Sequence, residues 1–121
     1  MKRVYVAGAY SADNVLKVFE NMRKGMQLST EVFLAGYAPF CPWFDYHFAL
    51  MSGLNDLTVD MFYEYSIAWL KVSDCMLLVP GWENSKGTLK EIEWAKLLNI
   101  PIYCSLDELK SKIDYDCENK K

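Results

Sequence analysis

Four short stretches of the chain are almost continuously apolar, which is typical of the buried strands of a parallel sheet. They are separated by longer stretches in which apolar and polar residues alternate with a helical period. The predicted strands are Arg3 to Ala7, Tyr37 to Cys41, Cys75 to Val79 and Ile100 to Cys104.

The longer stretches predict amphipathic helices over about residues 13–35, 59–72 and 88–98. Gly36 is expected to end the first helix, with Ser11 or Asp13 as its N-terminal cap. The buried stripe of the first helix is expected to comprise Val15, Val18, Phe19, Met22, Met26 and Phe33. The second helix is expected to bury Met61, Phe62, Tyr65, Trp69 and Val72.

This alternation of strands and helices predicts one α/β domain over residues 1–112. The expected fold has three layers, α/β/α, around a flavodoxin-like or Rossmann-like parallel sheet of four to five strands. A short capped helix is expected at 105–109, and a charged, frayed tail at 113–121. With 121 residues and 52% hydrophobic content, the chain can bury one core but is short for two domains.

Ligands of such sheets bind beyond the carboxyl ends of the strands, and this rule sorts the polar residues. Three segments follow strands and therefore share the functional edge: Gly8-Ala9-Tyr10-Ser11, the aromatic connection from Pro42 to about Thr58, and Pro80 to Thr88. The connection is longer than a link between two elements requires, as binding loops often are. Asp74 precedes its strand, so a structural cap at the opposite edge is expected.

Glu91 is a candidate for chemistry because of the helix face on which it lies. Thr88, Glu91, Ile92 and Ala95 recur at helical spacing, so a carboxylate shares the face that points at the sheet. A glutamate near a helix start can simply complement the helix dipole. The alternative is a catalytic carboxylate.

Charge and cysteine content narrow the function classes. A formal charge of −3 and a pI near 5.1 provide no electrostatic footprint for duplex nucleic acid or an anionic membrane surface. The cysteines, at 41, 75, 104 and 117, form no CxxC pair, and with one histidine they offer no metal-ligand set. We therefore expect reduced thiols, no metal, no cofactor, no membrane span and a cytoplasmic protein.

Three segments together resemble a known family: Val4-Tyr5-Val6-Ala7-Gly8-Ala9-Tyr10-Ser11, Ala68-Trp69-Leu70-Lys71-Val72-Ser73-Asp74 and Ser85-Lys86-Gly87-Thr88-Leu89-Lys90-Glu91. In this order and spacing they resemble the nucleoside 2-deoxyribosyltransferases and the deoxynucleoside 5'-monophosphate N-glycosidases, especially the short members from bacteria and phages. The resemblance covers roughly Lys2 to Leu109.

The resemblance implies cleavage of an N-glycosidic bond. By similarity, Glu91 would be the nucleophile and Tyr5 the residue whose hydroxyl supports it, although a buried tyrosine can equally be a core aromatic. Ser85, Gly87 and Thr88 match the loop that approaches the sugar or its 5' substituent, and Gly8 matches the first glycine turn. An ordinary capped loop is the alternative for 85–88.

The sequence departs from the family pattern at three positions. The monophosphate glycosidases have a serine and an arginine where this chain has Ala9 and Ser11, so no dedicated phosphate clamp is evident. Relatives also carry an aspartate associated with catalysis where this chain has Ser66. Asp60 or Glu64, near the start of the same helix, would be the substitutes, unless they are only solvated acids at a helix start.

The connection after Pro42 offers further candidates. The aromatic side chains around Trp43 can stack on a nucleobase, and Asp45 or His47 can protonate it as it leaves. A hydrophobic segment that packs over the sheet or onto another subunit is the alternative. The first turn adds further candidates for substrate binding, Gly8, Ala9, Tyr10 and Ser11.

Two functions follow from these observations. The first is an N-glycosidase or 2-deoxyribosyltransferase acting on a nucleoside or nucleoside 5'-monophosphate. The second is a module that binds a nucleoside or nucleotide without efficient chemistry, as Ser66 suggests. The resemblance also implies a homodimer or higher homo-oligomer in which a neighbour helps to complete the pocket.

Overall fold

The computed structural model describes residues 1–52 and 56–119, and within them four parallel strands form one sheet. The strand order is β2-β1-β3-β4, and Val4 of the central strand β1 pairs with Pro39 on one side and Cys75 on the other. The order reverses beside β1, as in doubly wound sheets. The strands are β1 (Arg3–Ala7), β2 (Ala38–Phe40), β3 (Cys75–Leu78) and β4 (Ile102–Tyr103).

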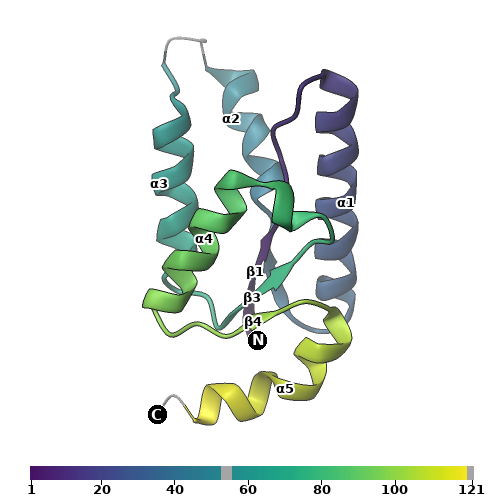
Figure 1. Cartoon of the computed structure of the whole chain (residues 1–121), viewed down its shortest axis with the longest axis vertical. Coiled ribbons are helices and arrows are strands. Elements are labelled where there is room, and N and C mark those ends of the chain that lie inside the picture. The colour runs from purple at the N-terminus through teal and green to yellow at the C-terminus, as the bar shows by residue number, and fades with distance from the viewer. Residues whose placement is uncertain (53–55, 120–121) are drawn as a thin grey trace.

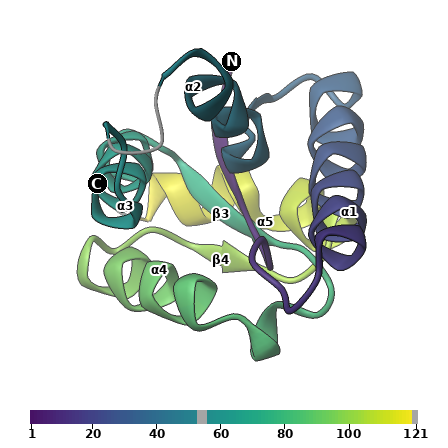
Figure 2. The same ribbon diagram turned by 90° about the horizontal axis from the view of Figure 1, so that it is seen from above.

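Helices lie on both faces of the sheet, which confirms the predicted three-layer α/β/α fold (Figures 1 and 2). Residues of α1 and α5 pack on one face, and residues of α3 and α4 pack on the other. The α-helices are α1 (Val15–Leu34), α2 (Tyr46–Met51), α3 (Val59–Leu70), α4 (Lys86–Leu97) and α5 (Leu106–Glu118), with the 3-10 helices η1 (Pro42–Asp45) and η2 (Trp82–Asn84).

The central strand β1 divides its side chains between two cores. Val4 and Val6 are fully buried on the face covered by α1 and α5, whereas Tyr5 and Ala7 are buried on the face covered by α3 and α4. This alternation follows from the two-residue period of a strand. It places the Tyr5 side chain on the face of the sheet that α4 covers.

Asp74 lies at the edge of the sheet where the strands begin. Its Oδ2 accepts a hydrogen bond of 2.7 Å from the backbone N–H of Arg3. The predicted structural role of this aspartate is thereby confirmed.

The buried stripe predicted for α1 is wrong in part: Met22 and Met26 are half-buried and pack against the core, but the fully buried positions are others. The helix instead buries Asn21, Gly25, Ser29 and Val32, while Val15, Phe19 and Phe33 are exposed. Small residues face the sheet because the large ring of Trp43 occupies the space against Gly25, where a Cβ would lie 2.4 Å from ring atoms. The cap also differs from the prediction: the Asn14 side chain, not Ser11 or Asp13, accepts from the Lys17 N–H.

The stripe predicted for α3 is also largely wrong. Ser66, Ile67 and Leu70 are the buried residues, whereas Met61, Tyr65, Trp69 and Val72 are exposed or at the threshold of exposure. Half-buried Phe62 lies between these two groups. The more apolar side of α3 therefore faces away from the sheet, toward a groove described below.

The aromatic connection after β2 is largely helical, contrary to the expectation of a loop. Residues 42–51 form η1 followed directly by α2, with Pro42 at the start of η1, where a missing N–H costs nothing. The part of the predicted loop at 53–55 lies outside the described residues.

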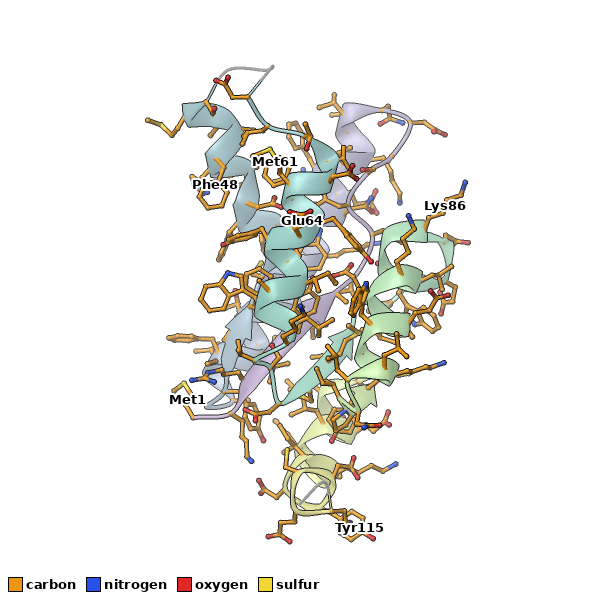
Figure 3. The ribbon with its side chains drawn as sticks, turned by 90° about the vertical axis from the view of Figure 1, so that its left-hand side faces the viewer. Met1, Phe48, Met61, Glu64, Lys86 and Tyr115 are labelled. Carbon is orange, nitrogen blue, oxygen red and sulfur yellow. The ribbon has the colours of Figure 1, made fainter. Side chains whose placement is uncertain are left out.

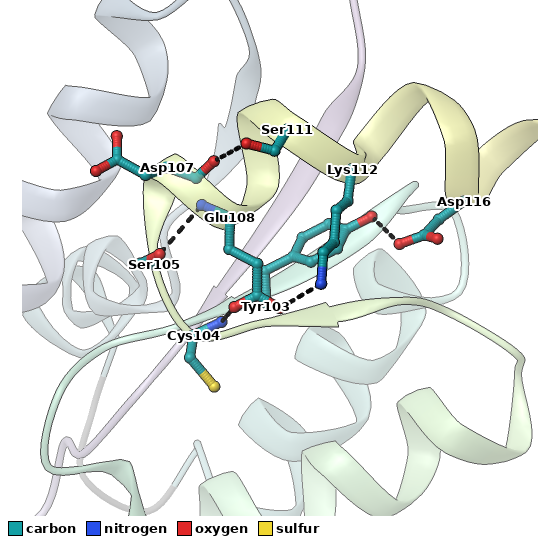
Figure 4. A network of polar contacts seen from close by, with 8 residues as sticks. All are labelled: Tyr103, Cys104, Ser105, Asp107, Glu108, Ser111, Lys112 and Asp116. Atoms are coloured by element: carbon teal, nitrogen blue, oxygen red, sulfur yellow. Dashed lines mark hydrogen bonds and ion pairs between the residues drawn. The ribbon is translucent and has the colours of Figure 1, made fainter.

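The predicted frayed tail is helical up to Glu118, so that expectation is wrong for residues 113–118; Lys120 and Lys121 lie outside the described residues. Ser105 caps α5, and Leu109 and Ile113 are buried against the sheet. Figure 4 shows the polar contacts that hold the helix, among them a 2.8 Å bond from the Tyr103 hydroxyl to Asp116. These contacts extend the domain beyond the predicted short helix.

Candidate active site

The turn after β1 passes unusually close to the end of β3. A Cβ on Gly8 would lie 2.7 Å from the Cβ of Val79, so any larger residue here would force the two segments apart. This close approach fixes the path of the next residues. It brings Tyr10 and Ser11 over the carboxyl edge of the sheet, where a ligand of a doubly wound fold binds.

Tyr5 and Glu91 meet between the sheet and α4. Ser85 caps α4 by accepting from the N–H of Thr88, and Glu91 follows on the next turn, on the helix side that faces β1. The Tyr5 hydroxyl donates a hydrogen bond to Oε2 of Glu91. Tyr5 is fully buried and Glu91 half-buried, and the side chain of Ser66 lies against the same hydroxyl.

The surroundings favour the neutral form of both partners. Burial raises the pKa of Glu91 from 4.5 to about 7, although the hydrogen bond from Tyr5 acts in the opposite direction. Burial, and then the charge of Glu91, raises the pKa of Tyr5 well above its usual value. Tyr5 therefore remains a hydrogen-bond donor, while Glu91 can change its charge near neutral pH.

A cavity of about 340 Å³ opens beside Glu91 at the carboxyl ends of β1 and β2. Its volume lies within the range of about 300–1,000 Å³ that is typical of small-molecule sites. We call it the Glu91 cavity. The residues that line it are Gly8, Tyr10, Ser11, Pro42, Trp43, Asp45, Tyr46, Ala49, Val59, Phe62, Tyr63, Ser66 and Glu91.

A second hollow, of about 1120 Å³, lies beside β4 and α5 and is larger. Its polar lining includes Lys112 and the acids Glu108 and Asp116, whose bonds to Cys104 and Tyr103 hold α5 in place. It contains neither Tyr5 nor Glu91. The smaller cavity is therefore the better candidate for a catalytic site.

Asp45 is the second carboxylate of the Glu91 cavity. It ends η1 and forms a hydrogen bond with the side chain of Tyr10, which follows β1. Burial raises the pKa of Asp45, whereas the bond from Tyr10 lowers it. Burial and the charge of Asp45 together raise the pKa of Tyr10.

Trp43 forms a wall of the cavity rather than a stacking platform. The side chain is 1% exposed, its ring lies against Gly25, and its Nε1 donates a 3.0 Å bond to the carbonyl of Ala9. The ring is thus almost entirely covered by protein. This geometry leaves the other aromatic side chains of the cavity as the surfaces available to a base.

A comparison with protein families gives a match over residues 2–104 to the domain of unknown function DUF4406. The chain belongs to this family. The match runs from β1 to β4 and includes every residue that lines the Glu91 cavity of the DUF4406 domain. A comparison with curated proteins gives no match. Within the described part of the DUF4406 domain, no helix is both long and apolar enough to cross a bilayer.

Several residues predicted for the site of this DUF4406 domain lie outside the Glu91 cavity. His47 is exposed, and its Nδ1 lies 3.0 Å from the carbonyl oxygen of Phe44. Thr88 is buried and donates a 2.9 Å bond to Ser85, while Gly87 is exposed with open space around it. Ala9 does not line the cavity, and its carbonyl accepts the bond from Trp43, which does.

The acids considered as substitutes at Ser66 lie outside the cavity. Asp60 and Glu64 of α3 are exposed, and Figure 3 shows Glu64 on the outer side of the helix. Neither Asp60 nor Glu64 is therefore placed to exchange protons with a ligand beside Glu91.

Lys86 projects into solvent from the start of α4 in the same view.

Apart from Ser66, sequence reasoning did not assign the α3 side of the DUF4406 cavity. Val59, Phe62, Tyr63 and Ser66 line it, together with Tyr46 and Ala49. A signal was present, because α3 is antiparallel to the strands and its first half must lie at their carboxyl edge. When this argument is applied to the aromatic residues of α3 as well as to its acids, it predicts that Phe62 and Tyr63 line the site.

Proposed function

We propose that this DUF4406 protein cleaves or transfers the N-glycosidic bond of a nucleoside or nucleoside 5'-monophosphate, with Glu91 as the nucleophile. One observation carries the proposal: a half-buried carboxylate, held by a buried tyrosine, lies in the wall of a ligand-sized cavity at the carboxyl edge of the sheet. The resemblance of residues 4–11, 68–74 and 85–91 to nucleoside 2-deoxyribosyltransferases supports the same chemistry.

In this mechanism, the Glu91 carboxylate attacks the anomeric carbon and forms a glycosyl-enzyme. Water, or a second base, then displaces Glu91 and completes hydrolysis or transfer. Tyr5 holds the attacking carboxylate in place by its hydrogen bond. Because Tyr5 is fully buried, it can fix the position of Glu91 with little loss of side-chain freedom during the reaction.

The walls of the Glu91 cavity suit a nucleobase better than a charged group. Tyr46, Phe62 and Tyr63 contribute aromatic surface, and such surfaces stack bases without strong sequence preference. Among the lining residues the charged side chains are Asp45 and Glu91, both acidic. A 5'-phosphate would therefore have to lie outside the cavity, toward the turn of Ser85 to Thr88 predicted for the 5' substituent.

The test is base release. Wild type, Glu91→Gln and the control Glu93→Gln, an exposed glutamate on the same helix, are incubated with ribo- and deoxyribonucleosides and their 5'-monophosphates. Free base is followed by chromatography, with and without an acceptor base. We expect release by wild type and Glu93→Gln and none by Glu91→Gln. No release by the wild type from any member would contradict the proposal.

Ser66 favours a second candidate function, a module that binds a nucleoside or nucleotide without turning it over. The residue is buried in the cavity wall beside the Tyr5 hydroxyl. At this position, the nucleoside 2-deoxyribosyltransferases that the sequence resembles carry an aspartate associated with catalysis. Saturable binding of a panel member by calorimetry, without base release, would support this function. Turnover gained by Ser66→Asp would indicate a site that has lost its chemistry.

We also propose that the protein self-associates through an aromatic groove of about 530 Å³ beside the edge strand β2. Phe40 stacks on Trp69, and Phe48 contacts Tyr65 edge to face, yet Phe48 and Trp69 each remain nearly half exposed. Surface patches of this kind commonly mark contact sites. Asp45 borders both the groove and the Glu91 cavity, so a second copy seated in the groove would lie next to the site.

A further inference from the structure

The Glu91 cavity is lined by two carboxylates that come from different elements of the fold. Glu91 projects from α4 and is held by Tyr5, whereas Asp45 ends η1 and is held by Tyr10. Each carboxylate thus has its own tyrosine donor, and neither is paired with a cation in the described contacts. A pair of carboxylates flanking one ligand is the arrangement by which glycosidic bonds are cleaved.

Resting on the proposed function, we infer that Asp45 is the general acid that protonates the nucleobase as it leaves. A nucleobase is a poor leaving group as an anion, so a proton donor at the cavity wall facing the base accelerates its departure. Asp45 is the acid, other than Glu91, that lines the cavity.

The step balances in atoms and charge. The Asp45 carboxyl transfers its proton to a ring nitrogen of the base while the bond between that base and the anomeric carbon breaks. The Glu91 oxygen forms the new bond to the anomeric carbon, and the neutral base departs. In hydrolysis, the Asp45 carboxylate then takes a proton from water as the water oxygen displaces Glu91, which restores both groups.

Burial favours the protonated form of Asp45, although the hydrogen bond from Tyr10 acts in the opposite direction. Tyr10 and Cys41 both have pKa values raised by burial, so both are neutral where the enzyme would work. Arg3 borders the aromatic groove that Asp45 also lines, but its guanidinium is directed to the carbonyl oxygen of Val72 at 3.4 Å.

Other proton donors fit this role less well. His47 is exposed and lies outside the cavity. Tyr10 and Tyr63 line it, but burial raises the pKa of each, which makes them weaker acids. Asp45 alone among these groups combines a place in the cavity wall with a carboxyl group, which is a stronger acid than a tyrosine hydroxyl.

The experiment compares two leaving groups in three variants. The substrates are the nucleoside that the wild type cleaves fastest and 4-nitrophenyl 2-deoxyriboside, whose leaving group departs as a stable anion. We expect Asp45→Asn to lower kcat/KM for the nucleoside by about 100-fold or more, and for the nitrophenyl glycoside by less than about 10-fold. Glu91→Gln should abolish both reactions. Asp60→Asn, an exposed aspartate outside the cavity, is the matched control and should change neither.

A pH profile of the wild type adds a readout that needs no variant. With a general acid, kcat/KM for the nucleoside falls on the alkaline side as the last proton leaves the two carboxylates, whereas the nitrophenyl reaction lacks this fall. Asp45→Asn should lose the same alkaline limb.

Three results would overturn the inference while leaving the proposed function intact. They are full nucleoside cleavage by Asp45→Asn, an equal loss on both substrates, and a wild-type nucleoside profile without an alkaline limb. Failure of the proposed function would look different, since the wild type would then cleave no member of the nucleoside panel.

Discussion

Glu91 lies in surroundings that oppose its charge, and this has a consequence for stability that is independent of any substrate. The native state holds the proton of Glu91 up to about pH 7, whereas an unfolded chain releases it near pH 4.5. Between these values the native state binds more protons, so the free energy of unfolding falls as pH rises. Above pH 7, the buried charge of Glu91 lowers the free energy of unfolding by the full amount, about 3 kcal/mol.

We therefore predict that Glu91→Gln stabilises the protein at pH 8 by up to about 3 kcal/mol, and that this gain disappears as pH falls below about 4.5. Urea unfolding of both proteins from pH 4 to pH 8 measures the difference. Glu93→Gln controls for the loss of one exposed negative charge. A gain that is absent at pH 8, or independent of pH, would contradict a desolvated carboxylate at position 91.

At the residue scale, the sequence predicted one half of the site better than the other. Helical spacing alone placed Glu91 toward the sheet, and the resemblance supplied Tyr5 as its partner, which is the contact in the structure. The contact between Tyr10 and Asp45 had no such signal. It depends on residues 42–51 folding into η1 and α2, and a run rich in aromatic residues does not reveal by its period that it is helical.

At the scale of elements, the positions of the helices were predictable but the rotation of two of them was not. Both α1 and α3 carry more apolar residues than the sheet can cover, so the most hydrophobic stripe and the buried stripe differ. In α1, one long-range contact decides which face of the helix is buried, namely that of the Trp43 ring with Gly25. Periodicity contains no information about a partner 18 residues further along the chain.

This contact leads to a prediction about α1. Alanine is normally favoured over glycine inside a helix, by roughly 0.5–1 kcal/mol. At position 25, however, the added methyl group would lie 2.4 Å from the Trp43 ring, so we expect Gly25→Ala to lower the free energy of unfolding by about 1–3 kcal/mol. Thermal and urea unfolding measure the change.

Gly87→Ala in the first turn of α4 is the matched control, because nothing lies within 4 Å of the added methyl group. It should leave stability unchanged or raise it. If Gly25→Ala were as stable as this control, the rotation of α1 and the position of Trp43 would both be wrong.

At the scale of the whole molecule, the doubly wound sheet and its functional edge followed from the order of strands and helices. The assembly did not follow from that order. The stripes that sequence periodicity assigned to the core are exposed in two places, along α1 and in the aromatic groove lined by α3. Each of these surfaces exposes several large apolar side chains, as contact sites between proteins commonly do. An experiment must therefore distinguish them.

We predict that the protein is a homodimer formed through the aromatic groove, and that Phe48→Glu makes it monomeric, because a buried charge without a partner opposes association. Phe33→Glu, which places the same charge on the exposed stripe of α1, should remain dimeric. Sedimentation velocity measures all three proteins. A monomeric wild type would refute self-association. Monomers from Phe33→Glu and dimers from Phe48→Glu would instead place the interface on the exposed stripe of α1.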